Sequence, residues 1–426
     1  MTVRDSLTFV GFGFGPIQAG LFLLEAFRSG NFRRMVVAEV LPDIVRSVRE
    51  EGGKFHLNIA HEDRIETVTL GPVELQDPAV DRDRERLVDA VAEASEIATA
   101  VPSVRFYKNE SPGSIHRVLA RGLLRRLERS PARGPVVIYA AENHNRAAEI
   151  LEEAVFSEIP KDLAGRVRAN VRFLNTVIGK MSGVIADTDR VQAAGLRTMT
   201  SRDPRALLVE RFNRILISRL PRGFHRGIEV FEEKDDLLPF EEAKLYGHNA
   251  AHSLAAYLAA RLGLVRLEEL GDVPGAVDFV FSAFLEESGE PLIRKWQGLD
   301  DLFTPQGYRA HAQDLMKRML NPNLGDLVER VARDPERKLG WEDRLVGTMR
   351  LAIAHGVVPR KFALGAAAAV AHWKPDVLRG GDPAAILEGV WRSSSPERAE
   401  AQQVLTLVRE GLEKVRAWES TGIPPF

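Results

Sequence analysis

Short apolar runs alternate with amphipathic segments through the first half of the chain. Runs of four to six apolar residues predict buried strands, and apolar positions that recur every three or four residues predict helices. Such runs predict strands at residues 7–10, 35–38, 97–101, 135–140, 171–174 and 183–186. Residues 55–59 and 66–70 also predict strands, because their apolar and polar residues alternate. Helical patterns lie between several of them, including residues 114–129. Strands and helices in this order are typical of an α/β domain with a parallel, doubly wound sheet.

The pattern changes near residue 195. Long segments rich in Ala, Leu, Arg and Glu then follow at helical spacing, at residues 236–262, 275–288, 306–320, 324–333, 342–355, 360–373 and 398–418. A chain of 426 residues also exceeds what one hydrophobic core usually supports. We therefore expect two domains, an α/β domain over residues 1–195 and a mainly α-helical domain over residues 196–426.

Composition narrows the possible partners. The 58 basic and 60 acidic residues are interspersed and nearly cancel, which gives no reason to expect binding to nucleic acid or to an acidic membrane. Cysteine is absent, which excludes disulfides, thiolate metal ligands and cysteine nucleophiles. The start of the chain lacks the apolar core of a signal peptide, and the apolar stretch at 362–373 is too short to cross a bilayer. We expect a cytoplasmic monomer or homodimer that acts on a small molecule.

Three glycines stand between the first predicted strand and the first predicted helix. Gly11, Gly13 and Gly15 would let the backbone approach a pyrophosphate, which the N-terminus of the following helix attracts. The match to the Gly-x-Gly-x-x-Gly pattern is imperfect, because residue 16 is proline and the next glycine is Gly20. The loop therefore favours a Rossmann-like dinucleotide-binding domain, and the alternative is a tight turn that binds nothing.

An acidic residue, Glu39, closes the second predicted strand. A carboxylate at this place accepts hydrogen bonds from ribose hydroxyls and repels a 2′-phosphate, which favours NAD over NADP. We expect NAD to be bound by Gly11, Gly13, Phe14, Gly15, Glu39 and Val101. The loop also resembles the first loop of flavin-dependent N-hydroxylating monooxygenases, but those proteins carry a second glycine-rich loop, which this sequence lacks.

The second predicted domain carries a polar constellation on one helix. On an α-helix at 100° per residue, Lys244, Asn249 and His252 fall within an arc of about 140° and span about 12 Å along the axis. Gly247 between them keeps the helix surface thin, and His248 points elsewhere. Three such groups can project into one cleft, although polar residues on a surface helix are more often simply solvated.

The Lys-x4-Asn-x2-His spacing resembles the signature of the polyol-specific long-chain dehydrogenases. Further segments resemble that family in the same order, at residues 138–143, 284–289, 319–326 and 330–345. The resemblance covers most of the chain and is strongest from residue 240 to 360. It implies a Rossmann domain followed by a helical domain, and the segment from 321 to 339 is similar to the branch that acts on phosphorylated sugar alcohols.

The resemblance also implies a mechanism. Lys244 would be the general base that takes the proton of a secondary alcohol, while Asn249 and Asn143 would donate to the oxygen where charge develops. His252 would form a hydrogen bond with the reacting oxygen or with a neighbouring hydroxyl and so fix the orientation of the substrate. Glu241 would relay the proton from Lys244 to water, or would only be a favourable charge near a helix start. No metal is required for this chemistry.

The substrate that the resemblance implies is a sugar alcohol or its phosphate, such as mannitol 1-phosphate, with fructose 6-phosphate as the corresponding ketose. The alternatives are a ketouronate reductase of the same family and a dinucleotide-binding protein without turnover. A group of basic residues would hold a substrate phosphate, or would form surface ion pairs; it comprises Arg333, Arg337, Lys338 and Arg344.

Two positions depart from the family pattern. Ile17 stands where the glycine loop usually continues with an arginine, and Gly179-Lys180 stands where the family has an acid followed by an arginine. These departures leave the Lys–Asn–His constellation intact. They bear on the affinity for NAD and on the identity of the polyol.

Overall fold

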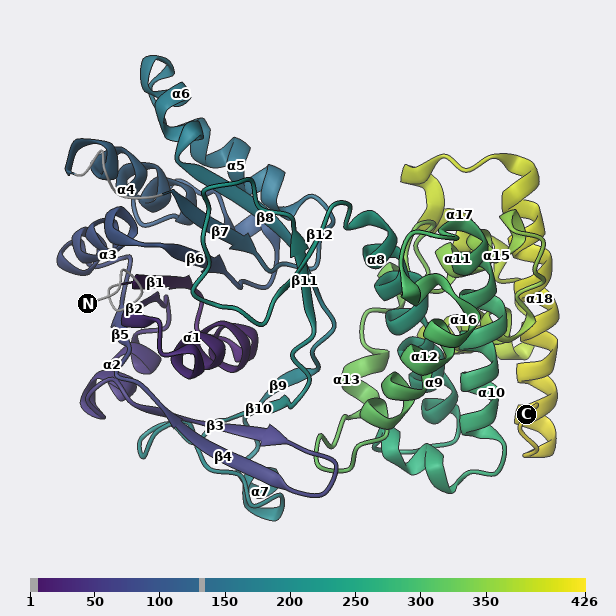
Figure 1. Ribbon diagram of the computed structural model, residues 1–426. Helices are drawn as coiled ribbons and strands as arrows, with labels where there is room; N and C mark the ends of the chain where they lie inside the picture. The colour runs from purple at the N-terminus through teal and green to yellow at the C-terminus, as the bar shows by residue number, and fades with distance from the viewer. Residues whose placement is uncertain (1–6, 130–134) are drawn as a thin grey trace. The chain divides into compact units, whose positions relative to one another are not determined.

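The computed structural model describes residues 7–129 and 135–426 and divides into two compact units, Met1–Leu238 and Pro239–Phe426 (Figure 1). The first six residues lie outside the described residues. They make up most of the segment for which the sequence predicts no signal peptide. Of the helices in the described part of the chain, not one combines the length and the apolar character needed to cross a membrane.

The main sheet of the first unit contains eight strands among the described residues, in the order β12-β11-β8-β7-β6-β1-β2-β5. Its bounds are β1 (Leu7–Phe12), β2 (Phe32–Ala38), β5 (Glu74–Gln76), β6 (Glu96–Thr99), β7 (Val136–Ala140), β8 (Val171–Ile178), β11 (Ile215–Ser218) and β12 (Glu232–Lys234). Neighbouring strands along the series β8-β7-β6-β1-β2-β5 pair in parallel, and β11 runs antiparallel to β8. This confirms the predicted doubly wound α/β architecture.

Helices and a second sheet cover the two faces of this main sheet. Neighbouring residues of a strand point to opposite faces, and Phe9 and Val10 of β1 accordingly belong to two different hydrophobic clusters. The cluster around Val10 includes α3, α4, α5 and α6, and the cluster around Phe9 includes α1 and α2 (Figure 1). The bounds are α1 (Leu24–Ser29), α2 (Pro42–Glu50), α3 (Asp81–Glu93), α4 (Ile115–Arg129), α5 (Ala147–Phe156), α6 (Lys161–Ala169) and α7 (Thr188–Ala193).

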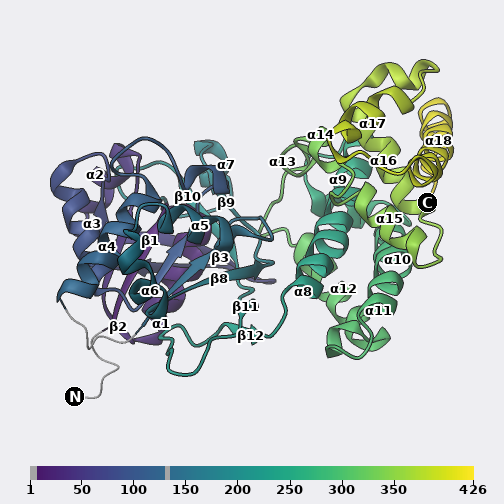
Figure 2. The same cartoon turned by 90° about the horizontal axis from the view of Figure 1, so that it is seen from above.

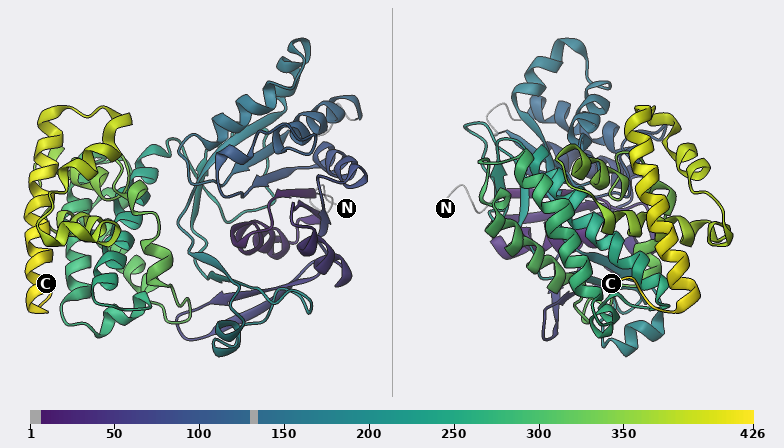
Figure 3. Two further views of the ribbon diagram at one scale, coloured as in Figure 1. Left: turned by 180° about the vertical axis from the view of Figure 1, so that it is seen from behind. Right: turned by 90° about the vertical axis from the view of Figure 1, so that its right-hand side faces the viewer.

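Some of the predicted strands belong to a separate, four-stranded sheet with the order β4-β3-β10-β9 (Figure 3). Its strands are β3 (Phe55–Ala60), β4 (Ile65–Leu70), β9 (Ser182–Ile185) and β10 (Ala206–Glu210). β3 pairs with β4 in an antiparallel hairpin and with β10 in parallel. The alternating pattern of residues 55–70 thus marks a second sheet rather than strands of the main one.

The first unit extends beyond residue 195, where the sequence pattern placed its end. Strands β10, β11 and β12 follow that position, and the unit ends at Leu238. β10 is fully buried and pairs with β3, whereas β11 pairs with β8. Each strand is only three to five residues long, so the local pattern does not distinguish it from a short helical segment.

The second unit is helical throughout its regular structure. Its helices are α8 (Leu238–Glu242), α9 (Asn249–Arg261), α10 (Ala276–Ser282), α11 (Glu290–Lys295), α12 (Pro305–Met319), α13 (Val328–Ala332), α14 (Pro335–Lys338), α15 (Val346–Ala354), α16 (Arg360–Trp373), α17 (Ala384–Trp391) and α18 (Arg398–Thr421). α16 packs against both α9 and α18 (Figure 2). The packing is close because Gly365 of α16 lies against Leu254, and Gly411 of α18 lies against the backbone of Ala363.

Candidate active site

The Lys–Asn–His segment is not a regular α-helix. Residues Ala243–His248 form a π-helical turn between α8 and α9, and the N–H of Asn249 donates to the carbonyl oxygen of Lys244, five residues earlier. Because this turn holds an extra residue, the rotation from Lys244 to Asn249 is closer to one full turn than the α-helical geometry predicts. The predicted arc of about 140° is therefore wrong. The two side chains lie closer to one face of the segment.

Gly247 lets a buried aromatic residue pack directly against this turn. A Cβ atom at Gly247 would lie 2.5 Å from the hydroxyl of Tyr308 and 2.9 Å from the ring of Phe284. The hydroxyl of Tyr308 is also 2.9 Å from the Ser288 hydroxyl, and both residues are buried. Contact of Tyr308 with the π turn thus depends on glycine between Lys244 and Asn249.

Lys244 has an altered proton affinity. Burial, with the positive charge of Arg344 acting in the same direction, lowers the pKa of Lys244 to about 8, and the nearby carboxylate of Glu241 opposes this shift. A substantial fraction of the amine is therefore neutral at mildly alkaline pH, which a general base requires. Glu241 lies in α8, within electrostatic reach of Lys244.

His252 contacts a carboxylate to which the sequence analysis gave no role. The Nε2 of His252 is 3.1 Å from Oδ2 of Asp326, whose side chain is almost completely buried. Oδ1 of Asp326 accepts a hydrogen bond from Nε of Arg330 at 2.8 Å. His248, by contrast, is a buried packing residue, and its ring centroid lies 6.2 Å from that of His252.

The basic group around residues 333–344 is engaged in contacts within the unit. Arg337 pairs with Asp334 at 2.7 Å, and Arg344 pairs with Asp343 at 2.8 Å. Lys338 is buried and donates to backbone carbonyl oxygens, those of Val331 and Arg333. These contacts favour the ion-pair interpretation for Arg337 and Arg344, while Lys338 stabilises the fold around α13.

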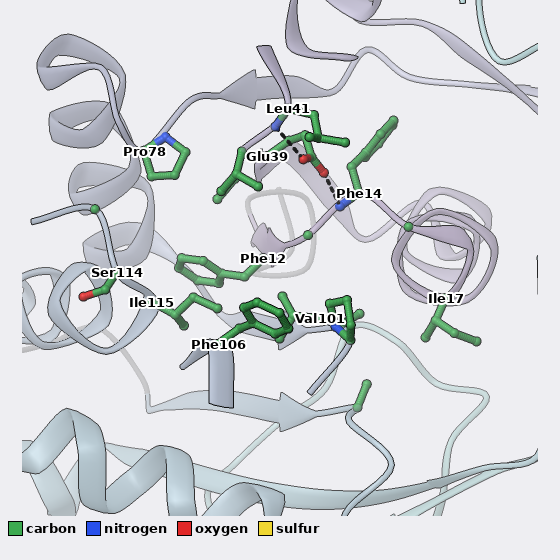
Figure 4. Close-up of a pocket in the computed structure, with 18 of the residues that line it drawn as sticks. Phe12, Phe14, Ile17, Glu39, Leu41, Pro78, Val101, Phe106, Ser114 and Ile115 are labelled. Atoms are coloured by element: carbon green, nitrogen blue, oxygen red, sulfur yellow. Dashed lines mark hydrogen bonds between the residues drawn. The ribbon is translucent and has the colours of Figure 1, made fainter. Parts of the chain in front are cut away.

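In the first unit, a cleft of about 570 Å³ opens at the carboxyl ends of β1 and β2 (Figure 4). Its lining includes five of the predicted cofactor-binding residues, Gly13, Phe14, Gly15, Glu39 and Val101. Gly13 has a φ of 86°, and a Cβ there would lie 2.7 Å from the carbonyl oxygen of Ala100. At Gly15 nothing lies within 4 Å of such an atom, so a ligand can approach the backbone there.

Gly11 is the exception among the predicted cofactor-binding residues. It does not line the cleft, because it lies within β1, where a Cβ would come within 2.4 Å of the Gln18 amide and 3.2 Å of Val37. Glycine at this position lets the segment after the loop pack onto the strand. Its contribution to a nucleotide site would therefore be indirect.

Glu39 joins the glycine loop to the end of β2. Oε2 of Glu39 accepts from the N–H of Phe14 at 2.9 Å, and Oε1 accepts from the N–H of Leu41 at 2.8 Å (Figure 4). Glu39 is largely buried and contributes to the wall of the cleft. The carboxylate therefore fixes the loop and places a negative charge where the sequence analysis expects ribose hydroxyls.

A second buried carboxylate holds the other wall. Oε1 of Glu142 accepts from the N–H of Val101 at 2.9 Å, and Oε2 accepts from Thr99 Oγ1 at 2.9 Å and from the hydroxyl of Tyr107. Burial raises the pKa of Glu142. Asn143, the next residue, is exposed directly after β7. This positioning role of Glu142 was not predicted, because it depends on contacts with Thr99, Val101 and Tyr107, which lie far from it along the chain.

The two departures from the family pattern have distinct structural consequences. Ile17 lines the cleft with an apolar side chain, so the glycine loop carries no guanidinium at this position (Figure 4). Lys180 is buried, and its Nζ donates to the carbonyl oxygen of Phe212 at 2.8 Å and to Oδ1 of Asn213 at 2.6 Å. Lys180 thus ties the end of β8 to the segment between β10 and β11.

Within residues 7–129 and 135–426, no three His, Asp or Glu side chains are grouped in a way that could hold a metal ion.

The doubly wound sheet with its glycine-lined cleft, followed by a helical unit, is the architecture of a two-domain dehydrogenase. Comparison with known families identifies residues 8–223 as a mannitol dehydrogenase Rossmann domain and residues 236–421 as a mannitol dehydrogenase C-terminal domain. The chain therefore belongs to the mannitol dehydrogenase family, which confirms the resemblance seen in the sequence.

Individual relatives agree with this assignment. Mannitol-1-phosphate 5-dehydrogenase of Bacillus licheniformis is 29% identical over 360 residues, which cover 84% of this chain and 86% of the relative. Mannitol 2-dehydrogenase of Pseudomonas fluorescens, solved with NAD and D-mannitol, matches with a TM-score of 0.72 at 16% identity, over 98% of this chain and 93% of that one. A D-sorbitol dehydrogenase in substrate-free form gives 0.73 at 15%, over 97% and 95%. The structural matches establish a shared fold.

Proposed function

We propose that the protein is an NAD-dependent dehydrogenase that interconverts a sugar alcohol and its ketose without a metal ion. The observation that carries this proposal is the environment of Lys244, which lowers the pKa of this lysine to about 8. Lys244 lies on the π turn, and its carbonyl oxygen accepts a hydrogen bond from the N–H of Asn249. Membership of the mannitol dehydrogenase family supports the class of substrate.

The lining of the cleft in the first unit supports NAD as the cofactor. Gly13 and Gly15 offer backbone that a pyrophosphate can approach, and Glu39 offers carboxylate oxygens that accept from ribose hydroxyls and repel a 2′-phosphate. When bound there, NAD would supply the acceptor for the hydride that leaves the substrate carbon. Because Ile17 stands where the family has an arginine, the loop carries no positive side chain at this position. We therefore expect the helix dipole and backbone N–H groups to supply most of the attraction for the pyrophosphate.

In this proposal the chain's polar residues move one proton and stabilise one charge. The neutral amine of Lys244 accepts the proton of the substrate hydroxyl, and Glu241 passes that proton on to water. The side-chain amides of Asn249 and Asn143 donate hydrogen bonds to the oxygen on which negative charge develops. His252 fixes the orientation of the substrate. These donors take the electrostatic part that a metal ion has in other alcohol dehydrogenases.

The leading candidate for the substrate pair is mannitol 1-phosphate and fructose 6-phosphate, which the name of the Bacillus licheniformis relative supports. The ion pairs of Arg337 and Arg344 weigh against a phosphate at those residues and keep an unphosphorylated polyol or a ketouronate as the second candidate. NADH oxidation measured with fructose 6-phosphate, fructose, tagaturonate and fructuronate distinguishes these substrates. We expect a rate with at least one of them.

The rival interpretation, a dinucleotide-binding protein without turnover, makes the opposite prediction. It predicts that NADH binds but that none of these ketoses is reduced. Lys244→Ala then tests the assignment of the base, with Lys414→Ala on the exposed surface of α18 as a matched control. The proposal expects Lys244→Ala to lose the rate and to bind NADH as the wild type does.

A further inference from the structure

The carboxylate of Asp326 restricts what His252 can do. Nε2 of His252 lies 3.1 Å from Oδ2 of Asp326, and the carboxylate is buried. A carboxylate only accepts hydrogen bonds, so the proton between these atoms belongs to Nε2. In a neutral imidazole one nitrogen donates and the other accepts, and the partner of one nitrogen fixes the role of the other. Nδ1 of His252 is then an acceptor.

The surroundings hold Asp326 in place. Gly325, with a φ of 56°, ends a turn in which the N–H of Leu324 donates to the carbonyl oxygen of Asn321 at 3.0 Å. The carbonyl oxygen of Asp326 accepts from the N–H of Leu267 at 3.0 Å, and Arg330 donates to Oδ1. Both the backbone and the side chain of Asp326 are therefore anchored before any ligand binds.

The assignment of the acceptor nitrogen has a consequence for substrate recognition. The reacting hydroxyl carries a single proton, and the proposed function gives that proton to the neutral amine of Lys244. A second acceptor cannot receive the same proton, so any substrate hydroxyl that donates to Nδ1 of His252 is a different one. Simple secondary alcohols lack such a group, whereas a polyol or a ketose carries one next to the reacting carbon.

We propose that Asp326 is a positioning residue that holds His252 with Nε2 protonated, so that Nδ1 recognises a hydroxyl adjacent to the reacting carbon. This inference rests on the proposed function, because it assigns the reacting proton to Lys244. It makes the Asp326–His252 pair a determinant of specificity for substrates with neighbouring hydroxyls. Arg330 supports the pair by neutralising the carboxylate charge.

The first test is independent of turnover. Histidine labelled with ¹⁵N in the full-length wild-type protein, with the His252 signal assigned by its loss in His252→Asn, reports which ring nitrogen carries the proton. We expect the proton on Nε2 and none on Nδ1. Protonation at Nδ1 instead would overturn the inference, whatever the protein catalyses.

The second test uses turnover and a double-mutant cycle. The discrimination is the ratio of kcat/KM for the best ketose to that for its analogue without the adjacent hydroxyl. We expect His252→Ala to lower this ratio about tenfold, the value of roughly one hydrogen bond. Asp326→Asn should lower it similarly, and the double variant should lower it no further, because Asp326 acts through His252. Asp382→Asn, which removes the carboxylate of an exposed ion pair with Arg409, is the matched control.

The outcomes separate the two proposals. If a ketose is reduced but Asp326→Asn keeps the full discrimination, or if the two losses add, the positioning role is wrong and the proposed function stands. If no ketose is reduced while the ¹⁵N signals show protonated Nε2, the proposed function fails and the tautomer assignment stands. Asp326→Glu, which retains a carboxylate, should recover part of the discrimination if Asp326→Asn proves too unstable to assay.

Discussion

The backbone N–H of Asn249 donates to the carbonyl oxygen of Lys244 across a π-helical turn. This bond joins residues that are five positions apart. A separation of five residues places two side chains closer to one face in a π-helical turn than it does in a regular α-helix. The turn is packed against Tyr308 at Gly247, which ties the geometry of the two polar residues to the helical core of the second unit.

Two charges near Lys244 should move the pH dependence of activity in opposite directions. The base must be neutral, so the rate of alcohol oxidation should fall as pH drops below a midpoint near 8. The Glu241 carboxylate raises the pKa of Lys244 and the Arg344 guanidinium lowers it. Glu241→Gln should therefore shift the midpoint to lower pH, and Arg344→Gln to higher pH. Profiles of kcat/KM against pH measure both shifts, and movement in the same direction would contradict the assignment.

The same pair of variants tests the relay role of Glu241. If Glu241 only modifies the charge around Lys244, Glu241→Gln should retain the plateau rate above the shifted midpoint. If Glu241 also passes the proton to water, the plateau itself should fall. Added small buffer bases should then restore part of the plateau rate, which distinguishes a lost relay from a disturbed fold.

Glu39 should set the preference between the two nicotinamide cofactors. Glu39→Gln removes the charge that opposes a 2′-phosphate but keeps an oxygen that accepts from Phe14 or Leu41. We expect the ratio of NADPH to NADH affinity to rise about tenfold, the order expected for one charge near the phosphate. Fluorescence titration measures it, and Glu74→Gln, on the exposed edge of the sheet, is the control. An unchanged ratio would mean that Glu39 does not face the ribose.

Gly247→Ala should destabilise the second unit. The added methyl group would meet the hydroxyl of Tyr308 at 2.5 Å and the ring of Phe284 at 2.9 Å, and overpacking of this kind typically costs about 1–3 kcal/mol. Combining it with Tyr308→Phe removes the closer contact, so the double variant should be more stable than the sum of the single effects predicts. Urea unfolding measures each step. Gly389→Ala in α17, where nothing lies within 4 Å of the added atom, should be neutral or stabilising.

Removal of metal ions should leave the activity unchanged. In the proposed reaction the amides of Asn249 and Asn143 stabilise the charge on the oxygen, so no step requires a Lewis acid. We expect the same kcat after dialysis against EDTA as before. A loss that Zn²⁺ or Mn²⁺ restores would contradict the proposal, and a loss that no metal restores would indicate damage to the protein.

The sequence predicted most strands of the main sheet well because they are continuous apolar runs. Val136–Ala140, buried at every position, is an example. Ala206–Glu210 is just as buried but was missed, since it stands alone in a region of helical composition and pairs with β3, far back along the chain. The boundary expected at residue 195 fails for the same reason.

In the candidate site, too, features that depend on the local sequence could be predicted, and contacts between distant residues could not. Glu39 and Val101 line one cleft because they follow parallel strands whose ends meet at one edge of the sheet, and strand ends can be predicted from the sequence. The contact between His252 and Asp326 joins residues 74 apart, which no local pattern reveals. The π turn was also missed, because residues 243–248 have the same apolar spacing as an α-helix and only the hydrogen bond to Lys244 distinguishes them.

The most direct test of the central claim is the rate of NADH oxidation by Lys244→Ala with the ketose that the wild type reduces best. The account predicts a loss of at least about a hundredfold in kcat, the usual contribution of a general base, with NADH affinity unchanged and with Lys414→Ala at the wild-type rate. A Lys244→Ala enzyme that reduces the ketose at the wild-type rate would contradict the account.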